Sequence, residues 1–339
     1  MKPIVHFSGL ALAVFAHIGE AYAADDLRGL PVLGQERELF LQETTALRGS
    51  IGVRTWISRS EYSQNLQTNQ GAVVARYEYS QSNAASGEVF FTLEDDITGA
   101  FLKGVAGLGV LSAGDFREQV ISEITGQELF DGSSDGDDGD LSYASIDAGV
   151  HGFEFLDGKV RTTAFVGYQY VRESYSADGL HCNPDDVSNV ICGALGPLPN
   201  PISNSVQTYD SDAQWHLFRL GVGVEADLGH GLFFEGEAVV NPVGYYRGEE
   251  TQTFRPHLGP SPQFVNEGAG AYGFQLEGIL SYALTENFSV GAGGRYWWFD
   301  NNRVEATVGA STSTPDTNSF KQEARSERYG LVAEAKYRF

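Results

Sequence analysis

The sequence has 339 residues, and its 45 acidic residues against 22 basic ones give a formal net charge of −23. This acidic balance disfavours a nucleic-acid partner, because proteins bind the phosphate backbone mainly through Lys and Arg. Beyond the N-terminal segment, no stretch approaches the roughly 18 consecutive apolar residues of a transmembrane helix. We therefore expect no such helix.

Residues 1–23 have the features of a secretory signal peptide. Lys2 provides a positive charge, the run from Ile4 to Ile18 is mostly apolar, and Ala21-Tyr22-Ala23 has the A-x-A pattern of a cleavage site. A retained membrane helix is the alternative interpretation, but polar residues make the apolar run too short for one. We expect an exported protein whose mature chain begins at Ala24.

Residues 24–45 show no strand alternation and are interpreted as an N-terminal arm, either periplasmic or tucked into a lumen. From residue 46 onward, apolar and polar residues alternate with a period of two, which predicts β-strands. The clearest case places Phe218 and Leu220 on one face and Arg219 and Gly221 on the other. The alternation predicts ten strands, which begin near residues 46, 72, 100, 140, 160, 213, 232, 274, 288 and 329.

Short and long connections alternate between these strands. Tight turns follow the second, fourth, sixth and eighth strands, whereas the third, fifth, seventh and ninth strands lead into long loops. This asymmetry is typical of outer-membrane β-barrels, which have short periplasmic turns and long external loops. The predicted loops cover residues 64–70, 114–139 and 177–212, the segment around Pro256, Pro260 and Pro262, and residues 307–325.

We therefore predict an all-β fold, a transmembrane antiparallel up-and-down β-barrel over residues 46–339. A soluble β-sandwich is the rival fold, but its chain usually turns every 8–12 residues and the strands predicted here are longer. The apolar rows would face lipid and carry no charge. Charges of both signs occupy the inward rows, namely Arg48, Arg54, Glu88, Lys103, Asp147, Arg161, Glu173, Arg219, Glu225, Asp227, Glu235, Glu237, Glu277, Arg295, Glu334, Lys336 and Arg338.

These inward charges define the expected interior of the barrel. In a lumen only ten strands wide they should pair with one another, because buried charges need partners. Such pairing favours a plugged, rigid barrel over a wide pore, which takes about 16–18 strands. A narrow, selective conduit is the alternative.

Cys182 and Cys192 lie in a stretch rich in Pro, Gly and Asn, and in an exported chain they predict a loop disulfide. A metal pair with the adjacent His181 is the alternative, but a zinc site would then lack a ligand. No cofactor is expected.

The acidic run formed by Asp131, Asp135, Asp137, Asp138 and Asp140 is open to two interpretations. It could collect calcium or magnesium, since both ions prefer oxygen ligands. Its spacing does not match the calcium loop of an EF-hand, and a solvated, flexible loop is the other interpretation.

Aromatic residues suggest contacts with the membrane surface. The 16 tyrosines suit the two interfacial girdles of a barrel. Trp297, Trp298 and Phe299 could bind sugar or lipid, although aromatic residues at a membrane interface more often anchor the barrel. His216, beside Trp215, is expected at the interface as well.

The closing strand, Tyr329 to Phe339, alternates apolar and mostly polar residues and ends on an aromatic side chain. It resembles the closing strand of bacterial outer-membrane barrels, whose terminal aromatic residue is read by the assembly machinery. The resemblance implies location in the outer membrane of a Gram-negative cell, contact with its lipid and lipopolysaccharide, and recognition of Phe339 by that machinery.

The ten-strand layout also resembles the omptins, which are outer-membrane proteases with an active site in the barrel mouth. The matching segments are the Gly-rich third strand before the acidic loop, residues 141–153, residues 164–179 and the closing strand. None of these segments is a catalytic motif.

The omptin resemblance implies an Asp-x-Asp pair after the third strand and an Asp-x-His pair after the seventh. The first location holds Asp115 and Glu118 without a second Asp two residues on, and the second holds Glu249 and Glu250 without a His. A general base must reach the water that it activates, so the family chemistry does not carry over and we predict no catalytic residue. A remodelled site of Asp115, Glu249 and His257 is the alternative.

The sequence thus predicts a non-enzymatic surface or structural protein of the outer membrane. One alternative is an omptin-type protease, an aspartic-type endopeptidase with an altered active site. A narrow channel or small-solute porin is the other. No metal-binding or cofactor-binding residue is predicted.

Overall fold

The computed structural model describes residues 47–68, 70–112, 114–182, 192, 195–196, 199–309 and 316–339. The predicted signal peptide, residues 1–23, and the arm over residues 24–45 lie outside these residues. The strands are β1 (Leu47–Thr68), β2 (Val73–Asp95), β3 (Ala100–Ser112), β4 (Asp115–Ile121), β5 (Glu128–Phe155), β6 (Val160–Cys182), β7 (Ile202–Gly229), β8 (Leu232–Asn241), β9 (Gly244–Gln252), β10 (Phe264–Ala269), β11 (Tyr272–Ala283), β12 (Phe288–Val308) and β13 (Asp316–Arg338), with a 3-10 turn, η2 (Pro256–Leu258).

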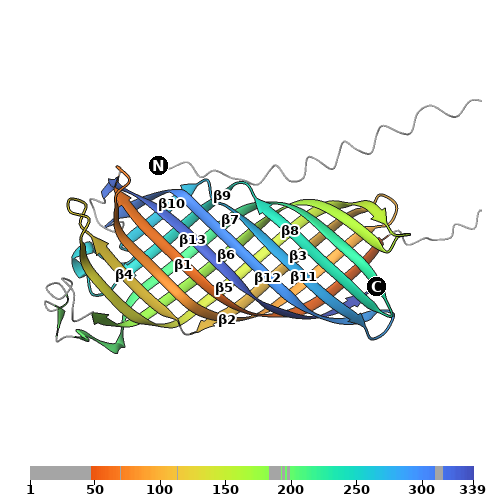
Figure 1. Cartoon of the computed structure of the whole chain (residues 1–339), viewed down its shortest axis with the longest axis horizontal. Coiled ribbons are helices and arrows are strands. Elements are labelled where there is room, and N and C mark those ends of the chain that lie inside the picture. Colours follow the sequence, from red (N-terminus) through yellow and green to blue (C-terminus); the bar gives the residue numbers. More distant parts are fainter. Residues whose placement is uncertain are drawn as a thin grey trace, which may run out of the picture. The chain divides into compact units, whose positions relative to one another are not determined.

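These strands form one antiparallel sheet that closes on itself (Figure 1). Neighbours in the chain are mostly neighbours in the sheet, as β1 with β2 and β5 with β6. The first and last strands, β1 and β13, pair along most of their length and so complete the ring. A closed ring leaves no unpaired strand edge, which a sheet in lipid requires. The predicted up-and-down barrel is confirmed.

Three local interruptions divide the strands, so that the 13 described segments make a ring of about ten strands. β3 continues as β4 beyond Gly114 (φ 137°), β8 continues as β9 beyond Pro242, and β10 leads into β11 through Gly270 (φ 106°). A Cβ atom at Gly114 would lie 2.9 Å from the carbonyl oxygen of Ser80, so only glycine fits this bulge. Pro242 has no N–H to donate to a neighbouring strand.

The apolar rows face outward, as the alternation predicts. Leu108, Val222 and Leu331 are each at least 60% exposed, whereas Trp56 and Arg219 on the inward rows are buried. Exposed apolar side chains arranged in continuous rows are what a barrel presents to the hydrocarbon of a membrane. The predicted inward and outward assignments are therefore confirmed for the membrane-facing part of the barrel.

This apolar band ends partway along the barrel. On β1 it extends from Leu47 to Ile57, which matches the about 9–11 residues of a transmembrane strand. The next outward residues are Arg59 and Glu61. Beyond this level the strands continue as what we call the extramembrane barrel, at the end opposite the C-terminus (Figure 1). It comprises residues 59–68, 73–81, 115–121, 128–140, 172–182, 202–214, 246–252, 264–269, 301–308 and 316–327.

The extramembrane barrel corrects the predicted loops. Residues 114–139 are not a long loop, because β4 and β5 occupy most of that range, and within 177–212 the ends that the structure describes belong to β6 and β7, which reach Cys182 and begin at Ile202. Likewise β1 extends to Thr68, β10 lies in the proline-rich segment, and β13 begins at Asp316. The outer face of these strands meets water instead of lipid and is polar, and the inner face mixes aromatic rings with amides and carboxyl groups. The apolar alternation that marks a half-buried strand is therefore missing.

Cys182, the last residue of β6, forms the predicted disulfide with Cys192. The bond ties the outer end of the barrel to the segment that follows β6. Among the described residues, the search for a helix long and apolar enough to cross a membrane found none.

Substitution of Ile146 tests the position of the apolar band. Ile146→Arg should destabilise the folded barrel by about 2–4 kcal/mol, because a charged side chain on the outward face of β5 would enter the hydrocarbon. Reversible urea unfolding in phospholipid vesicles measures this loss. Glu61→Arg is the matched control, since Glu61 lies on the extramembrane barrel opposite Glu327 and should lose no stability. Equal losses in both variants would contradict the assigned band.

Candidate functional site

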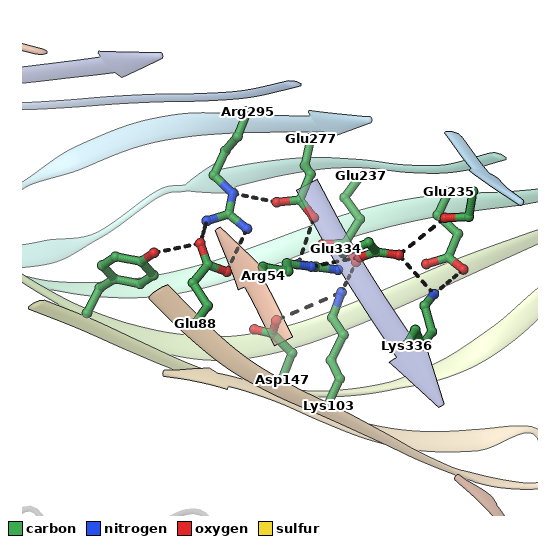
Figure 2. A network of polar contacts seen from close by, with 12 residues as sticks. Arg54, Glu88, Lys103, Asp147, Glu235, Glu237, Glu277, Arg295, Glu334 and Lys336 are labelled. Atoms are coloured by element: carbon green, nitrogen blue, oxygen red, sulfur yellow. Dashed lines mark hydrogen bonds and ion pairs between the residues drawn. The ribbon is translucent and has the colours of Figure 1, made fainter. Parts of the chain in front are cut away.

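An ionic network fills the interior at the level of the apolar band (Figure 2). Arg295 lies between two carboxylates, with Nη1 2.6 Å from Oε1 of Glu88 and Nε 2.5 Å from Oε2 of Glu277. Arg54 binds the other oxygen of Glu277 at 3.0 Å and Oε2 of Glu334 at 2.8 Å. The two guanidinium groups share Glu277, and together these side chains join β1, β2, β11, β12 and β13 across the lumen.

The network continues toward the end of the barrel that carries the short turns. Lys336 pairs with Glu235. Nζ of Lys103 lies 4.0 Å from Asp147, which also accepts a hydrogen bond from Nε of Arg219 at 2.9 Å. These contacts confirm the prediction that inward charges pair with one another.

A cavity of about 130 Å³ lies among these charged groups and is lined by Arg54, Lys103, Glu237 and Glu277, among others. A polar space of this size has room for several water molecules, each of which needs two to four polar partners. The cavity therefore belongs to the ionic network, where water can complete the hydrogen bonding of groups that the ion pairs leave unsatisfied.

An aromatic layer of Trp56, Tyr143 and Trp297 closes the lumen above the network. The ring of Trp56 lies 4.6 Å from that of Trp297 and 6.1 Å from that of Tyr143. The hydroxyl of Tyr143 donates a hydrogen bond to Glu88 at 2.6 Å, and the guanidinium of Arg295 lies 4.9 Å from the Trp56 ring. All three rings are at most 6% exposed, so they form a packed floor beneath the extramembrane barrel.

Further aromatic rings fill the extramembrane barrel. Tyr62 and Tyr79 stack on Tyr175, with centroids 5.3 and 4.9 Å away. Phe116 packs between Tyr79 and Tyr209. Many of the tyrosines are thus interior residues, which corrects the expectation that they serve mainly in the interfacial girdles.

The three aromatic residues near the end of the ninth predicted strand face different ways. Trp297 and Phe299 are buried in the interior, so the expectation that they bind sugar or lipid, or anchor the barrel, is wrong for both. Trp298 faces outward and packs on Phe274. His216 lies on the outer surface, with Nδ1 2.5 Å from the hydroxyl of Tyr168.

Two buried carboxyl groups point into the extramembrane barrel from strands that are not neighbours. Glu118 on β4 accepts a hydrogen bond from the hydroxyl of Tyr209 and forms an ion pair with Arg255 at 2.8 Å. Glu250 on β9 is 8% exposed and accepts a hydrogen bond from Nδ2 of Asn266 at 2.8 Å. We call the two carboxyl groups, Arg255 and three amides the mouth cluster, which consists of Glu118, Glu250, Arg255, Gln64, Asn266 and Gln322.

Both carboxyl groups lie outside the apolar band, and burial raises the pKa of each. For Glu118 burial raises the pKa from 4.5 to about 7, although the positive charge of Arg255 acts in the opposite direction. Burial also raises the pKa of Glu250 from 4.5 to about 7, against the hydrogen bonds from Gln64, Gln322 and Asn266. Carboxyl groups perturbed in this way often mark functional sites, so the mouth cluster is the candidate site of this barrel.

The residues suggested for a remodelled protease site are not brought together. Asp115 and Glu249 lie on the outward face, where Glu249 pairs with Arg247 at 2.6 Å. The side chain of His257 lies outside the described part of the chain. The inward carboxyl groups are Glu118 and Glu250, which the sequence reasoning did not select. The alternation of inward and outward residues along each strand could have identified them, because both occupy inward positions.

The acidic run is part of β5 and not a loop. Asp131 pairs with Arg117 at 2.7 Å, and Asp135 accepts a hydrogen bond from Asn204 at 2.5 Å. Within the described residues, no group of three or more His, Cys, Asp or Glu side chains is arranged to hold a metal ion. The alternative of a metal pair at Cys182 and Cys192 is wrong, because the two sulfurs are bonded to each other.

This chain is similar in structure to several known outer-membrane proteins. No family model and no curated protein sequence match the chain. The outer membrane protease OmpT from Escherichia coli is similar with a TM-score of 0.63 at 11% identity, over 86% of this chain and 97% of that chain. The outer membrane protein OprG from Pseudomonas aeruginosa has a TM-score of 0.34 at 11% identity, over 86% and 96% of the two chains. A Pseudomonas aeruginosa FadL homologue has a TM-score of 0.29 at 9% identity, over 87% and 90%.

The closed antiparallel ring, its apolar band and the OmpT similarity define the class of protein. The chain has the fold of a bacterial outer-membrane β-barrel. Its layout resembles that of an omptin. At 11% identity the similarity concerns the fold alone, and the mouth of the barrel must be interpreted from its own residues.

The ionic network can be tested by removing one cation. Arg295→Leu should destabilise the barrel by about 3–5 kcal/mol, because Glu88 and Glu277 would stay buried without their shared partner. Urea unfolding in vesicles again provides the measurement. Arg247→Leu removes an exposed ion pair and should cost less than about 1 kcal/mol. Similar losses for the two arginines would show that the interior pairs do not determine stability.

Proposed function

We propose that this protein is a non-enzymatic surface and structural protein of the bacterial outer membrane, built as a barrel closed to solutes. The observation that carries the proposal is the continuous filling of the lumen. The ionic network, the aromatic layer and the mouth cluster follow one another along the barrel, and each is held by contacts to several strands. Inward side chains that bind one another leave little room for a substrate or a passing solute.

A narrow channel is the second candidate, and the aromatic layer argues against it. The cavity within the ionic network, of about 130 Å³, and a second space near the short turns, of about 450 Å³, share Thr92, Glu94 and Lys336 among their lining residues. Both lie on one side of Trp56 and Trp297, which are almost fully buried. A continuous path would require these rings to move apart.

An omptin-type protease is the third candidate. Proteolysis is a property of OmpT, and fold similarity alone does not transfer it. In this chain Glu118 is fully buried and engaged by Arg255 and Tyr209, so it cannot reach a peptide. No histidine is among the partners described for Glu118 or Glu250, and a carboxyl group alone lacks the base partner that the omptin chemistry uses.

The outward surface supports the proposed contacts with membrane lipid, lipopolysaccharide and the barrel-assembly machinery. The apolar band would contact membrane lipid, and lipopolysaccharide would cover the level at which outward charges begin. The closing strand would be recognised by the barrel-assembly machinery through Phe339, whose ring is 63% exposed on the outward face while its backbone pairs with Gly49. Export would require removal of residues 1–23.

Planar-bilayer recording tests the closed barrel. The wild-type protein should show no steady conductance, because the aromatic layer blocks the lumen. Trp56→Ala combined with Trp297→Ala should create a measurable conductance, since two of the three rings of the layer are lost. Trp298→Ala, one residue along but on the outward face, is the matched control and should stay silent. Steady current through the wild-type protein would favour the channel.

A peptide-turnover assay on barrel refolded with lipopolysaccharide tests the protease alternative. The wild-type protein should cleave no faster than a Glu118→Gln, Glu250→Gln double variant, because neither carboxyl group is placed to activate water. Cleavage that disappears in the double variant would refute the non-enzymatic assignment.

A further inference from the structure

The mouth cluster contains a buried carboxyl group without a cation. Glu250 points inward from β9, and its described partners are the amides of Asn266, Gln64 and Gln322. Arg255 is the cation of the cluster, and it is engaged by Glu118 at 2.8 Å. Among the contacts of the described residues, ionised Glu250 would therefore be a buried negative charge stabilised by neutral donors.

Among the described residues, the cations of this region, Arg255 and Arg328, are each engaged by a carboxylate other than Glu250. One layer below, Arg328 is engaged by Glu173 at 2.8 Å. In the contacts described, β10 and β13 contribute neutral amides. The titratable side chains of the other inner walls are Tyr62 from β1, Tyr77 and Tyr79 from β2, Glu118 from β4, Tyr175 from β6, Tyr209 from β7 and Tyr246 from β9. Asp210 and Asp212 of β7 lie on the outward face, where Asp212 pairs with Arg172.

Acceptors without donors lie in the same region. Among the described residues, Oδ1 of Asn266 and Oε1 of Gln322 are buried and have no hydrogen-bond partner, and both polar atoms of the Gln252 amide also lack one. An ionised carboxylate only accepts hydrogen bonds, whereas a protonated one also donates. A half turn of the Asn266 or Gln322 amide would bring its oxygen toward the proton of Glu250. Protonation of Glu250 thus supplies a hydrogen-bond donor beside two amide oxygens that lack one.

Three of the strands are interrupted between the apolar band and this cluster. β9 is separated from β8 at Pro242, β10 from β11 at Gly270, and β4 from β3 at Gly114. Each outer segment is paired with neighbouring strands that continue into the band, as β9 is with β7 and β10 with β12, but it is not continuous with the strand segment below it. The outer segments can therefore loosen while the membrane-embedded ring stays paired.

From these observations we infer that Glu250 is a proton-operated latch of the extramembrane barrel. As a neutral acid it joins β9 and β10 to Gln64 of β1 and Gln322 of β13 across the interior. When it loses its proton, burial of the charge costs more than the amide donors return, and the β9–β10 side of the mouth is released toward water. The inference goes beyond the proposed function, because it requires neither a channel nor an enzyme.

The direction of the pH dependence follows from the raised pKa of Glu250. Since its pKa rises from 4.5 to about 7 on folding, the folded state holds this proton more tightly than the unfolded chain. The stabilisation is complete below about pH 4.5, declines as the pH rises and is lost above about pH 7. One pKa unit is a factor of ten, so the shift corresponds to a roughly 300-fold change in the closing equilibrium. Glu118 acts in the same direction.

Hydrogen exchange of the full chain in lipid nanodiscs tests the latch. After correction for intrinsic exchange rates, amide protection in β9 and β10 should fall by up to roughly 70-fold between about pH 5 and pH 8. Glu250→Gln keeps a neutral donor at this position and should retain most of its protection at the higher pH. Glu249→Gln, the neighbouring residue on the outward face, is the matched control and should behave as wild type.

A second measurement keeps the inference testable if Glu250→Gln fails to fold. Infrared difference spectroscopy of the wild-type barrel should show a protonated carboxylic acid that titrates near pH 7, and Glu118→Gln should remove only part of that signal. Protection that is independent of pH, an absent acid signal, or a Glu249→Gln variant that acts like Glu250→Gln would overturn the latch.

Discussion

A sheet that closes on itself in lipid leaves its inward charges without bulk water, and this constraint organises the whole interior. Each charged group on an inward row must be neutralised or hydrogen bonded by other strands, because a lone buried charge is strongly unfavourable. The Arg54–Glu277–Arg295 arrangement meets that requirement by sharing one carboxylate between two cations from different strands. The ion pairs therefore also fix how distant strands face one another, which backbone pairing between neighbours alone does not do.

The same constraint is met differently along the barrel. At the level of the lipid, ion pairs dominate, and Trp56 and Trp297 then exclude water by filling the lumen with rings. Beyond the membrane the outer face is in water, and the interior changes to tyrosines, amides and two carboxyl groups. Only Glu118 of these two has a cation. Along the barrel, the interior therefore changes from the ionic network, where opposite charges balance, to the packed aromatic layer and then to the mouth cluster, whose net charge depends on protonation.

Much of this fold could be predicted because alternation reports the side of a strand wherever one face meets lipid. Arg219 and Leu220 were assigned to opposite faces on this ground, and the structure agrees. The alternation is weak over residues 114–139 because the outer face meets water and the inner face mixes Glu118 and Ser134 with Phe116 and Phe130, so the two faces differ little in polarity. The alternation does predict the orientation of three further side chains. Trp297 is on the inward row of Arg295, and Glu118 and Glu250 are at inward positions of their own strands. The pairing of Glu118 with Arg255 could not be predicted, because β4 and the segment after β9 meet only once the ring closes.

The similarity to OmpT, at 11% identity, illustrates how little the ring requires of its mouth. Closure and lipid contact depend on alternation, small turns and a neutralised lumen, and many sequences satisfy them. Outside the lipid the wall is solvated on its outer face, so an inward carboxyl group can exchange a proton with water once the segments around it loosen. A charge that would have to be paired permanently within the membrane can be left to protonation there. Glu250 lies outside the lipid, beyond the breaks in the strands at Pro242 and Gly270. An acid without a cation can be tolerated there because it can take up a proton. The same acid would be far more costly within the membrane, among the ion pairs around Arg295.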